Sequence, residues 1–319
     1  MPGALVVSLD FELYWGVRDV VSLSSYRDAL LGVRDAIPAI LSAFARRDVH
    51  ATWATVGMLL CRDKRELLEL APARRPRYED PRLDPYRLED VGTDERDDPF
   101  HFGRSLAQRI LDTPGQELGT HTFSHFYCLE AGQTVEDFEA DLDAASRIAE
   151  RMKVTLRSVV FPRNQVNVAY FPALLRRGIG VFRSNGTHWA YRAATFPEPL
   201  AKRATRLADA YLPISGPRVG EATRDGSGMI DVPASMLLRP WSRRLRHAEP
   251  LRLRRITSAM RRAARDGGLF HLWWHPHNFG RNLRENLAAL DAVLTVFESL
   301  RESHGMSSLT MAEAAARAS

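Results

Sequence analysis

Short apolar runs and amphipathic helical stretches alternate along almost the whole chain, and this alternation constrains the fold more than any other feature. Helical patterns such as those over 26–47 and 136–152 are long enough to cross back over a sheet. Strands separated by such helices pair in parallel through right-handed connections. Runs typical of buried strands cover residues 6–12, 51–57, 117–120, 156–161, 178–183, 229–233, 269–274 and 307–310. Seven or eight strands in 319 residues therefore predict an α/β fold, and favour one barrel over two domains.

Two segments interrupt the alternation. Around 73–103, Pro, Arg and Asp dominate and the hydrophobic periodicity is lost, which predicts an inserted surface loop that could cover the site. Around 239–266 the chain is helical and rich in arginine, and Glu249 is the only acid between 239 and 265. We therefore expect one domain over 1–319, with a surface insertion and an Arg-rich helical segment.

The Arg-rich segment has three interpretations. It is a solvated helix face, or a patch for the phosphate groups of a nucleotide- or lipid-linked substrate or for an anionic membrane surface. Nucleic acid is the third, and the lack of a recognised nucleic-acid module or interleaved aromatic residues disfavours it. The formal net charge of +5 is compatible with each of them.

The sequence also bears on the compartment. Two cysteines, Cys61 and Cys128, are too few for a disulfide framework, so we expect buried free thiols. The apolar run near Met1 has no basic start and ends at Asp10, unlike a secretory signal. No apolar stretch approaches the length needed to cross a bilayer. The expected location is cytoplasmic, with peripheral contact at the inner membrane face as a variant of it.

Ionisable side chains follow two of the predicted strands. His121 and His125 lie four residues apart, and a helical turn there would place both rings on one face. Asp10 and Glu12 end the first strand at positions i and i+2, so they share a side. Taken singly, the histidines would form a surface pair and the acids would cap a turn or a helix. Together, at the edge where parallel α/β folds gather their active sites, two His and one carboxylate predict a hydrolytic metal site.

Other side chains near strand ends are expected to contact a substrate: Trp15, Asn164, Gln165, Trp274, His277 and Asn278. Packing over the barrel mouth is the alternative for Trp15, and capping of the following helix is the alternative for His277 and Asn278. Because neighbouring strand residues alternate, Trp273 and Trp274 cannot both face a cleft. We expect Trp273 to pack outside.

Three motifs, in this order, resemble those of the polysaccharide deacetylase superfamily, the NodB-homology or carbohydrate esterase family four group. They are Asp10-Phe-Glu12, His121-Thr-Phe-Ser-His125 and Trp274-His275-Pro276, and the resemblance covers most of the chain. It implies a distorted (β/α) barrel of about seven parallel strands, and hydrolytic removal of an acyl group from an N-acylated sugar. It further implies that Glu12, His121 and His125 hold a metal, that Asp10 is the catalytic base and that His275 is the general acid.

The chain departs from the family pattern in places. The family's first motif has adjacent aspartates, whereas Phe11 separates the two acids here. The family has an Arg two residues before a Pro, where this chain has Val160, so we expect Arg163 to orient Asp10 and keep it ionised. Asp231 is only a loose counterpart of the fourth motif. The implied cofactor is one divalent cation, zinc first, although cobalt, nickel or manganese suit the ligands as well.

The expected function is metal-dependent removal of an N-acyl group, acetyl in the first place, from a sugar or sugar precursor in glycan biosynthesis. The substrate could be nucleotide- or lipid-linked, and nucleic acid is not expected as a partner. One alternative is a glycoside hydrolase using Asp10 and Glu12 as its carboxylate pair, although their placement on one side argues against it. The other is a non-catalytic module that binds a sugar or a membrane surface.

Overall fold

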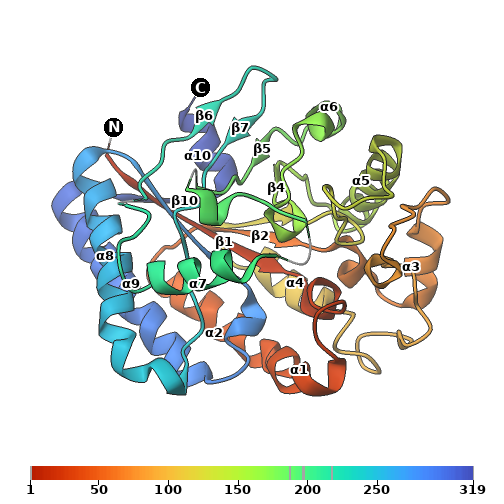
Figure 1. Cartoon of the computed structure of the whole chain (residues 1–319), viewed down its shortest axis with the longest axis horizontal. Coiled ribbons are helices and arrows are strands. Elements are labelled where there is room, and N and C mark those ends of the chain that lie inside the picture. Colours follow the sequence, from red (N-terminus) through yellow and green to blue (C-terminus); the bar gives the residue numbers. More distant parts are fainter. Residues whose placement is uncertain (1, 187, 196–197, 217, 319) are drawn as a thin grey trace.

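The computed structural model describes residues 2–186, 188–195, 198–216 and 218–318 (Figure 1). Its strands are β1 Ala4–Phe11, β2 Ala51–Thr55, β3 Gln116–Thr120, β4 Ser158–Val159, β5 Val181–Phe182, β6 Thr223–Arg224, β7 Ile230–Asp231, β8 Met236–Leu237, β9 Leu269–Trp274 and β10 Ser307–Leu309. Its α-helices are α1 Leu23–Leu31, α2 Val33–Arg46, α3 Lys64–Leu70, α4 Arg104–Leu111, α5 Val135–Arg151, α6 Phe171–Leu175, α7 Leu200–Asp209, α8 Glu249–Asp266, α9 Leu283–His304 and α10 Met311–Arg317.

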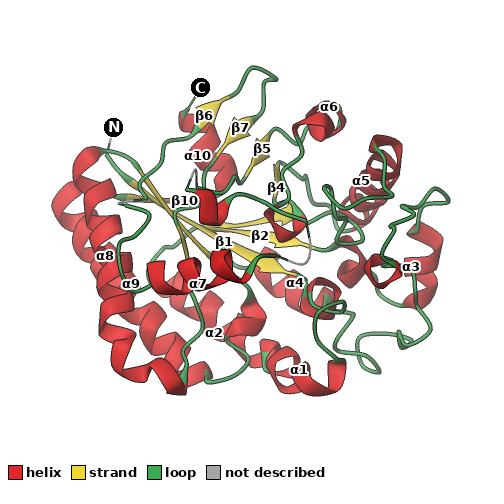
Figure 2. Ribbon diagram, viewed as in Figure 1, coloured by secondary structure: helices red, strands yellow, loops and turns green. Residues whose placement is uncertain are grey.

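The strands form one sheet in the middle of the molecule, with helices around it (Figure 2). The order is β6-β7-β5-β4-β3-β2-β1-β9-β8, and β10 pairs with the start of β1. Every described pairing between two of these strands is parallel except that of β6 with β7. All eight residues of β1 are buried, because helices cover both faces of a parallel sheet and enclose its central strands.

One extended segment, residues 230–238, joins the two ends of this sheet. At its start, the Val232 amide donates to the Phe182 carbonyl at the end of β5 (2.9 Å). Further along, the Ser235 amide donates to the His271 carbonyl of β9 (2.9 Å). We call residues 230–238 the seam segment. With it counted as a single strand, and with β6 and β10 outside the ring, the curled sheet has seven strand positions. The predicted α/β barrel is confirmed.

The helix predicted over 26–47 is two helices, α1 and α2, which meet at Gly32. A Cβ on Gly32 would lie 2.0 Å from the Gly280 carbonyl oxygen, so the chain passes here too close to another backbone for a side chain. Pro38 lies inside α2 without ending it. The inner face of α2 packs on the sheet, where the Phe44 ring lies 6.2 Å from that of Trp274.

The insertion around 73–103 is irregular apart from one short 3₁₀ turn, as expected, yet it is packed rather than open. Tyr78, Tyr86 and Leu88 in it are buried. Its end is held by Arg34 of α2, whose Nη2 donates to the Phe102 carbonyl (2.6 Å). The insertion is therefore a fitted part of the surface beside the carboxyl ends of the strands.

The Arg-rich segment is mixed in character. In α8, Arg252 and Arg255 are buried, while Arg254 and Arg261 are exposed. The prediction of a solvated helix face is therefore wrong for Arg252 and Arg255, which are buried. In the described part of the chain, no helix combines the length and the apolar character needed to cross a bilayer.

Candidate active site

Several ionisable side chains lie directly after the carboxyl ends of parallel strands. Glu12 directly follows β1, His121 follows β3, Arg183 follows β5 and His275 follows β9. Strands of a parallel sheet end at one edge, and the loops that leave this edge can converge over it. The candidate site lies at this edge.

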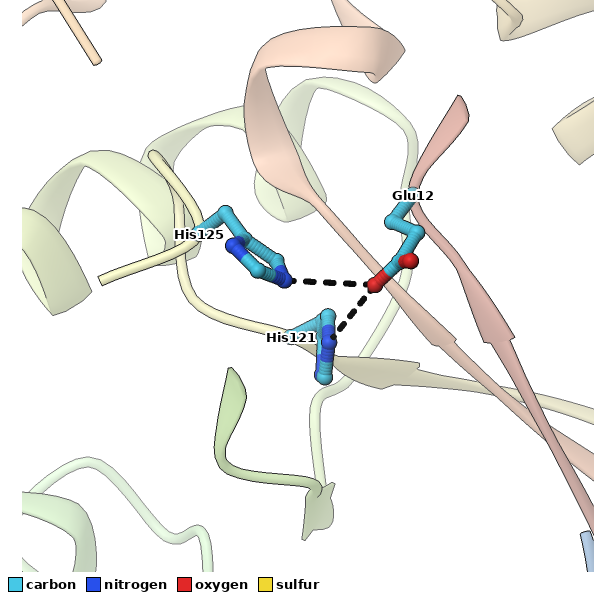
Figure 3. Close-up of side chains that lie close together, drawn as sticks. All are labelled: Glu12, His121 and His125. Carbon is cyan, nitrogen blue, oxygen red and sulfur yellow. Dashed lines mark hydrogen bonds and ion pairs between the residues drawn. The ribbon is translucent and has the colours of Figure 1, made fainter. Parts of the chain in front are cut away.

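Glu12, His121 and His125 point toward one another (Figure 3). The Glu12 Oε2 atom lies 3.3 Å from His121 Nε2 and 3.2 Å from His125 Nε2. The three ligand atoms lie within 4.8 Å of one another and all three residues are buried. Two ligands at about 2.0–2.1 Å from a tetrahedral zinc ion are themselves about 3.3 Å apart. The separations from Glu12 thus fit a shared cation.

The protonation states of these groups also fit a cation. His121 Nδ1 lies 2.7 Å from the Val160 carbonyl oxygen, which can only accept, so Nδ1 donates there and Nε2 is the ring atom that a cation could bind. Burial lowers the pKa of His125 to about 4 and keeps its ring neutral. Burial alone would raise the pKa of Glu12, but His275 and the two histidines outweigh it and hold that pKa well below the usual value. Neutral imidazoles and an ionised carboxylate are the forms in which such groups bind a divalent cation.

The two histidines converge through a loop rather than through the helical turn predicted for 121–125. Thr122 and His125 have φ values of 64° and 61°, which a helix does not contain. Asp141 of α5 holds this loop, because its carboxylate accepts from the amides of Phe123 (2.7 Å) and Ser124 (3.2 Å). His121 and His125 do lie close together, as their spacing predicted, but the predicted helical turn between them is wrong.

Asp10 lies beside the triad and forms a two-pronged ion pair with Arg183. Arg183 Nη1 donates to Asp10 Oδ1 and Nη2 donates to Oδ2, each at 2.8 Å. The same guanidinium donates to Ser8 Oγ (2.9 Å) and Asn164 Oδ1 (2.8 Å), and it lies 4.3 Å from the centre of the Trp273 ring. Burial raises the pKa of Asp10, but Arg183 more than offsets it with the help of nearby histidines, and the net pKa is lowered.

The expectation that Arg163 orients Asp10 is corrected. Arg163 pairs with Asp19 instead, and its guanidinium lies 4.4 Å from the centre of the Tyr127 ring. Arg183 makes the contact that was assigned to Arg163. Arg183 directly follows β5, which lies within the strand predicted over 178–183. Like His121, Arg183 is therefore an ionisable residue at the end of a predicted strand.

His275 stands on the other side of the carboxylates. Its Nε2 lies 3.5 Å from Glu12 Oε1 and 3.8 Å from Asp10 Oδ2, and 26% of its side chain is exposed. The buried His277 stacks on it, with ring centres 4.9 Å apart. Burial, and then the charge of His275, lower the pKa of His277 to about 3, so His277 is a neutral support. The Asn278 amide donates to the His275 carbonyl (2.9 Å), and a substrate contact of Asn278 stays a prediction.

Three residues expected to contact a substrate are packed inside the protein, and these expectations are corrected. Trp15 is 1% exposed and its Nε1 donates to the His101 carbonyl (2.8 Å), which fastens the insertion. Gln165 is fully buried, and its amide nitrogen donates to Glu130 (2.7 Å). Trp274 is fully buried against α2.

Trp273, the neighbour of Trp274 on β9, lines a cavity instead of packing inside the protein. Trp273 and Asn164 line a cavity of about 850 Å³ next to the site, together with Asp19 and Arg163. Trp273 contacts His275 from this side, since the centres of the two rings lie 5.7 Å apart. The two tryptophans do face opposite sides of the sheet, as predicted. The prediction of which one faces the cavity is wrong, because Trp273 lines it and Trp274 is buried.

Comparison with known proteins identifies the fold. No family model matches the chain, and no curated protein matches its sequence. A candidate polysaccharide deacetylase from Mycobacterium smegmatis aligns with 12% identity and a TM-score of 0.60, over 100% of this chain and 91% of that one. Puue allantoinase aligns with 11% identity and a TM-score of 0.55, over 99% and 88%. The 4-alpha-glucanotransferase of Thermococcus litoralis aligns with 12% identity and a TM-score of 0.54, over 99% of this chain and 41% of that one. These likenesses show a shared fold.

Proposed function

We propose that this chain, which has the fold of the polysaccharide deacetylase superfamily, is a metal-dependent hydrolase that removes an N-acyl group, acetyl in the first place, from a sugar in glycan biosynthesis. The observation that supports this best is the convergence of Glu12, His121 and His125 with the Asp10–Arg183 pair alongside. The fold shared with a candidate polysaccharide deacetylase supports the substrate class.

The chain's own groups supply the proton transfers. A divalent cation bound by Glu12, His121 and His125, with zinc as our first choice, would lower the pKa of a coordinated water from about 16 to about 7 and polarise the acyl carbonyl. Asp10 accepts the proton of the attacking water, and its lowered pKa keeps it ionised for this task. Arg183 holds both carboxylate oxygens of Asp10 and so fixes the direction from which Asp10 reaches the water.

His275 completes the reaction from the opposite side. Breaking the C–N bond releases an amine, which must gain a proton to leave, and the acyl group departs as a carboxylic acid with the oxygen of water. His275 is close to both carboxylates and is partly exposed, so it can protonate the amine and exchange protons with solvent. Acid and base then act from different strands, β9 and β1.

A glycoside hydrolase using Asp10 and Glu12 is disfavoured by their contacts. Acid and nucleophile must flank a glycosidic bond, each free to approach it. Here Asp10 is fixed by Arg183, and Glu12 lies between two imidazoles. The likeness to a glucanotransferase concerns the fold and does not alter this.

The proposal is tested by metal analysis of the purified protein, with an acetate- and formate-release screen on N-acylated sugars. We expect about one divalent ion per chain, activity that is lost on chelation and restored by zinc, and loss of both in His121→Ala. His304→Ala removes an exposed histidine at the end of α9 and is the matched control. Full activity in the chelated, metal-free protein would refute the proposal. A cytoplasmic location belongs to the same proposal and is checked by cell fractionation.

A further inference from the structure

The cavity beside the active site is the natural place for the rest of the substrate. Its volume of about 850 Å³ lies within the range of about 300–1,000 Å³ that ligand sites occupy. Two of its lining residues touch the proposed catalytic groups directly: Asn164 Oδ1 accepts from Arg183, and the Trp273 ring lies against the Arg183 guanidinium and edge-on to His275. A molecule whose reacting group lies at Asp10 would therefore extend into this cavity.

The lining of the cavity is strongly basic. Seven arginines and three carboxylates line it. Each of the three carboxylates already has a guanidinium partner: Asp19 pairs with Arg163, Glu198 with Arg206, and Asp209 with Arg255. Arg82 and Arg252 also pair with acids outside the lining, Asp80 and Glu249, so Arg203 and Arg239 supply the positive charge that can meet whatever enters the cavity.

Arg239 is the guanidinium best placed to meet a ligand. It lines the cavity and is partly buried, and no hydrogen bond or ion pair of its side chain is found among the described residues. Its backbone is fixed, because its carbonyl accepts from Arg252 Nη1 (2.6 Å). Burial lowers the pKa of Arg239, and the charges of Arg206 and Arg252 add to this effect. Three guanidinium groups thus lie near one another, and two of them are neutralised by Glu198 and Glu249.

We infer that this cavity binds a phosphoryl group of the substrate, with Arg239 as its principal ligand. The inference rests on the proposed function and narrows it, since the substrate would be a phosphorylated N-acyl sugar. Arginine binds phosphate oxygens through paired N–H donors. A doubly charged phosphate, or a diphosphate, matches the surplus of guanidinium groups better than a singly charged carboxylate does. Arg203, exposed at the cavity wall on α7, is placed to hold further oxygens.

Titration calorimetry on the intact protein tests this with four probes. N-acetylglucosamine 1-phosphate and N-acetylglucosamine differ only in the phosphate, and glucuronic acid supplies a carboxylate. UDP-N-acetylglucosamine supplies a nucleotide-linked diphosphate. A fifth arm measures sedimentation with phosphatidylcholine vesicles, with or without a polyprenyl phosphate, which separates a lipid-linked source from a soluble one. The proteins compared are wild type, Arg239→Gln, Arg239→Lys and, as matched control, Arg261→Gln, which alters an exposed arginine of α8 outside the cavity.

Wild type should bind the 1-phosphate at least about tenfold more tightly than the neutral sugar, and Arg239→Gln should lose roughly 10- to 100-fold for phosphorylated probes only. Arg239→Lys should retain part of the affinity that Arg239→Gln loses, and Arg261→Gln should bind every probe as wild type does. Equal binding of the 1-phosphate by wild type and a folded Arg239→Gln overturns the inference, and so does equally tight, Arg239-dependent binding of glucuronic acid.

Metal content and acyl release are measured on the same preparations. If both are intact while Arg239 has no effect on binding, the phosphate site fails and the proposed function stands. If phosphate binding depends on Arg239 but the protein neither holds metal nor releases acyl groups, the proposed function fails instead.

Discussion

The space beside Gly16 is needed for Glu12 to act as a ligand in the proposed metal site, and the variant Gly16→Ala tests this directly. A Cβ at position 16 would lie 2.0 Å from Glu12 Cδ and 2.2 and 2.4 Å from its two carboxylate oxygens. Non-bonded heavy atoms settle at about 3.5 Å, so the carboxylate must move by about 1.5 Å. Metal ligands tolerate displacements of only about 0.2 Å, so Glu12 would no longer be a ligand.

The expected result is loss of metal without loss of the fold. The φ of Gly16 lies outside the left-handed region, so alanine fits its backbone and should change the free energy of unfolding by no more than about 1 kcal/mol. Displacing an outer-shell partner already costs about 10- to 100-fold in metal affinity, and displacing a ligand should cost at least about 100-fold, or about 2.7 kcal/mol. The assay is zinc titration against a competing chelator, with urea unfolding of the metal-free protein.

Gly180→Ala is the control, because a Cβ there meets nothing within 4 Å. It should bind zinc as wild type does. If Gly16→Ala also binds zinc with wild-type affinity, Glu12 is not a ligand in the orientation described, and the account of the metal centre is wrong.

Three further predictions concern the neighbouring groups. Arg183→Leu removes the charge that lowers the pKa of Asp10, so that pKa should rise. The acid limb of the pH–rate profile should then move to higher pH, and kcat/KM should fall by roughly 100-fold. An acid limb that does not move would contradict the role of Arg183. His275→Gln should lower kcat by roughly 10²- to 10⁴-fold with unchanged metal content, and loss of the metal would show that His275 acts as a ligand instead. Trp274→Ala should lower the free energy of unfolding by about 3–5 kcal/mol in urea titrations and leave zinc affinity unchanged; a loss of less than 1 kcal/mol would show that Trp274 is not packed as described.

The sequence predicted the elements whose signal is local. The run of buried apolar residues in β1 and β9, and the polar groups that follow them, were enough to place Asp10, Glu12 and His275 at one edge. Parallel topology brings strand ends together whatever their separation in sequence. Much of the barrel and of the metal triad could therefore be anticipated.

Contacts between distant segments were harder to anticipate. Arg163 and Arg183 both follow short strands, and only the curl of the sheet decides which of them reaches Asp10. The sides of Trp273 and Trp274 depend on the register of β9 against β1 and β8, and alternation alone gives two equivalent answers. The role of Gly16 depends on the rotamer of Glu12, for which the sequence carries no signal.

The seam segment has a consequence for how the site can come apart. Its ladders are short: it pairs in register with β5 at two positions and with β9 at two, whereas β1 pairs with β2 at four positions and β2 with β3 at five. Glu12 and His121 follow β1 and β3, which β2 joins directly at a distance from the seam. Local unfolding starts where pairing is sparse, and unzipping here would part Arg183 from β9 while the metal ligands kept their places. Under the proposed function, such a partly unfolded form would hold its cation and lack a working base and acid, so metal occupancy and turnover would be lost separately.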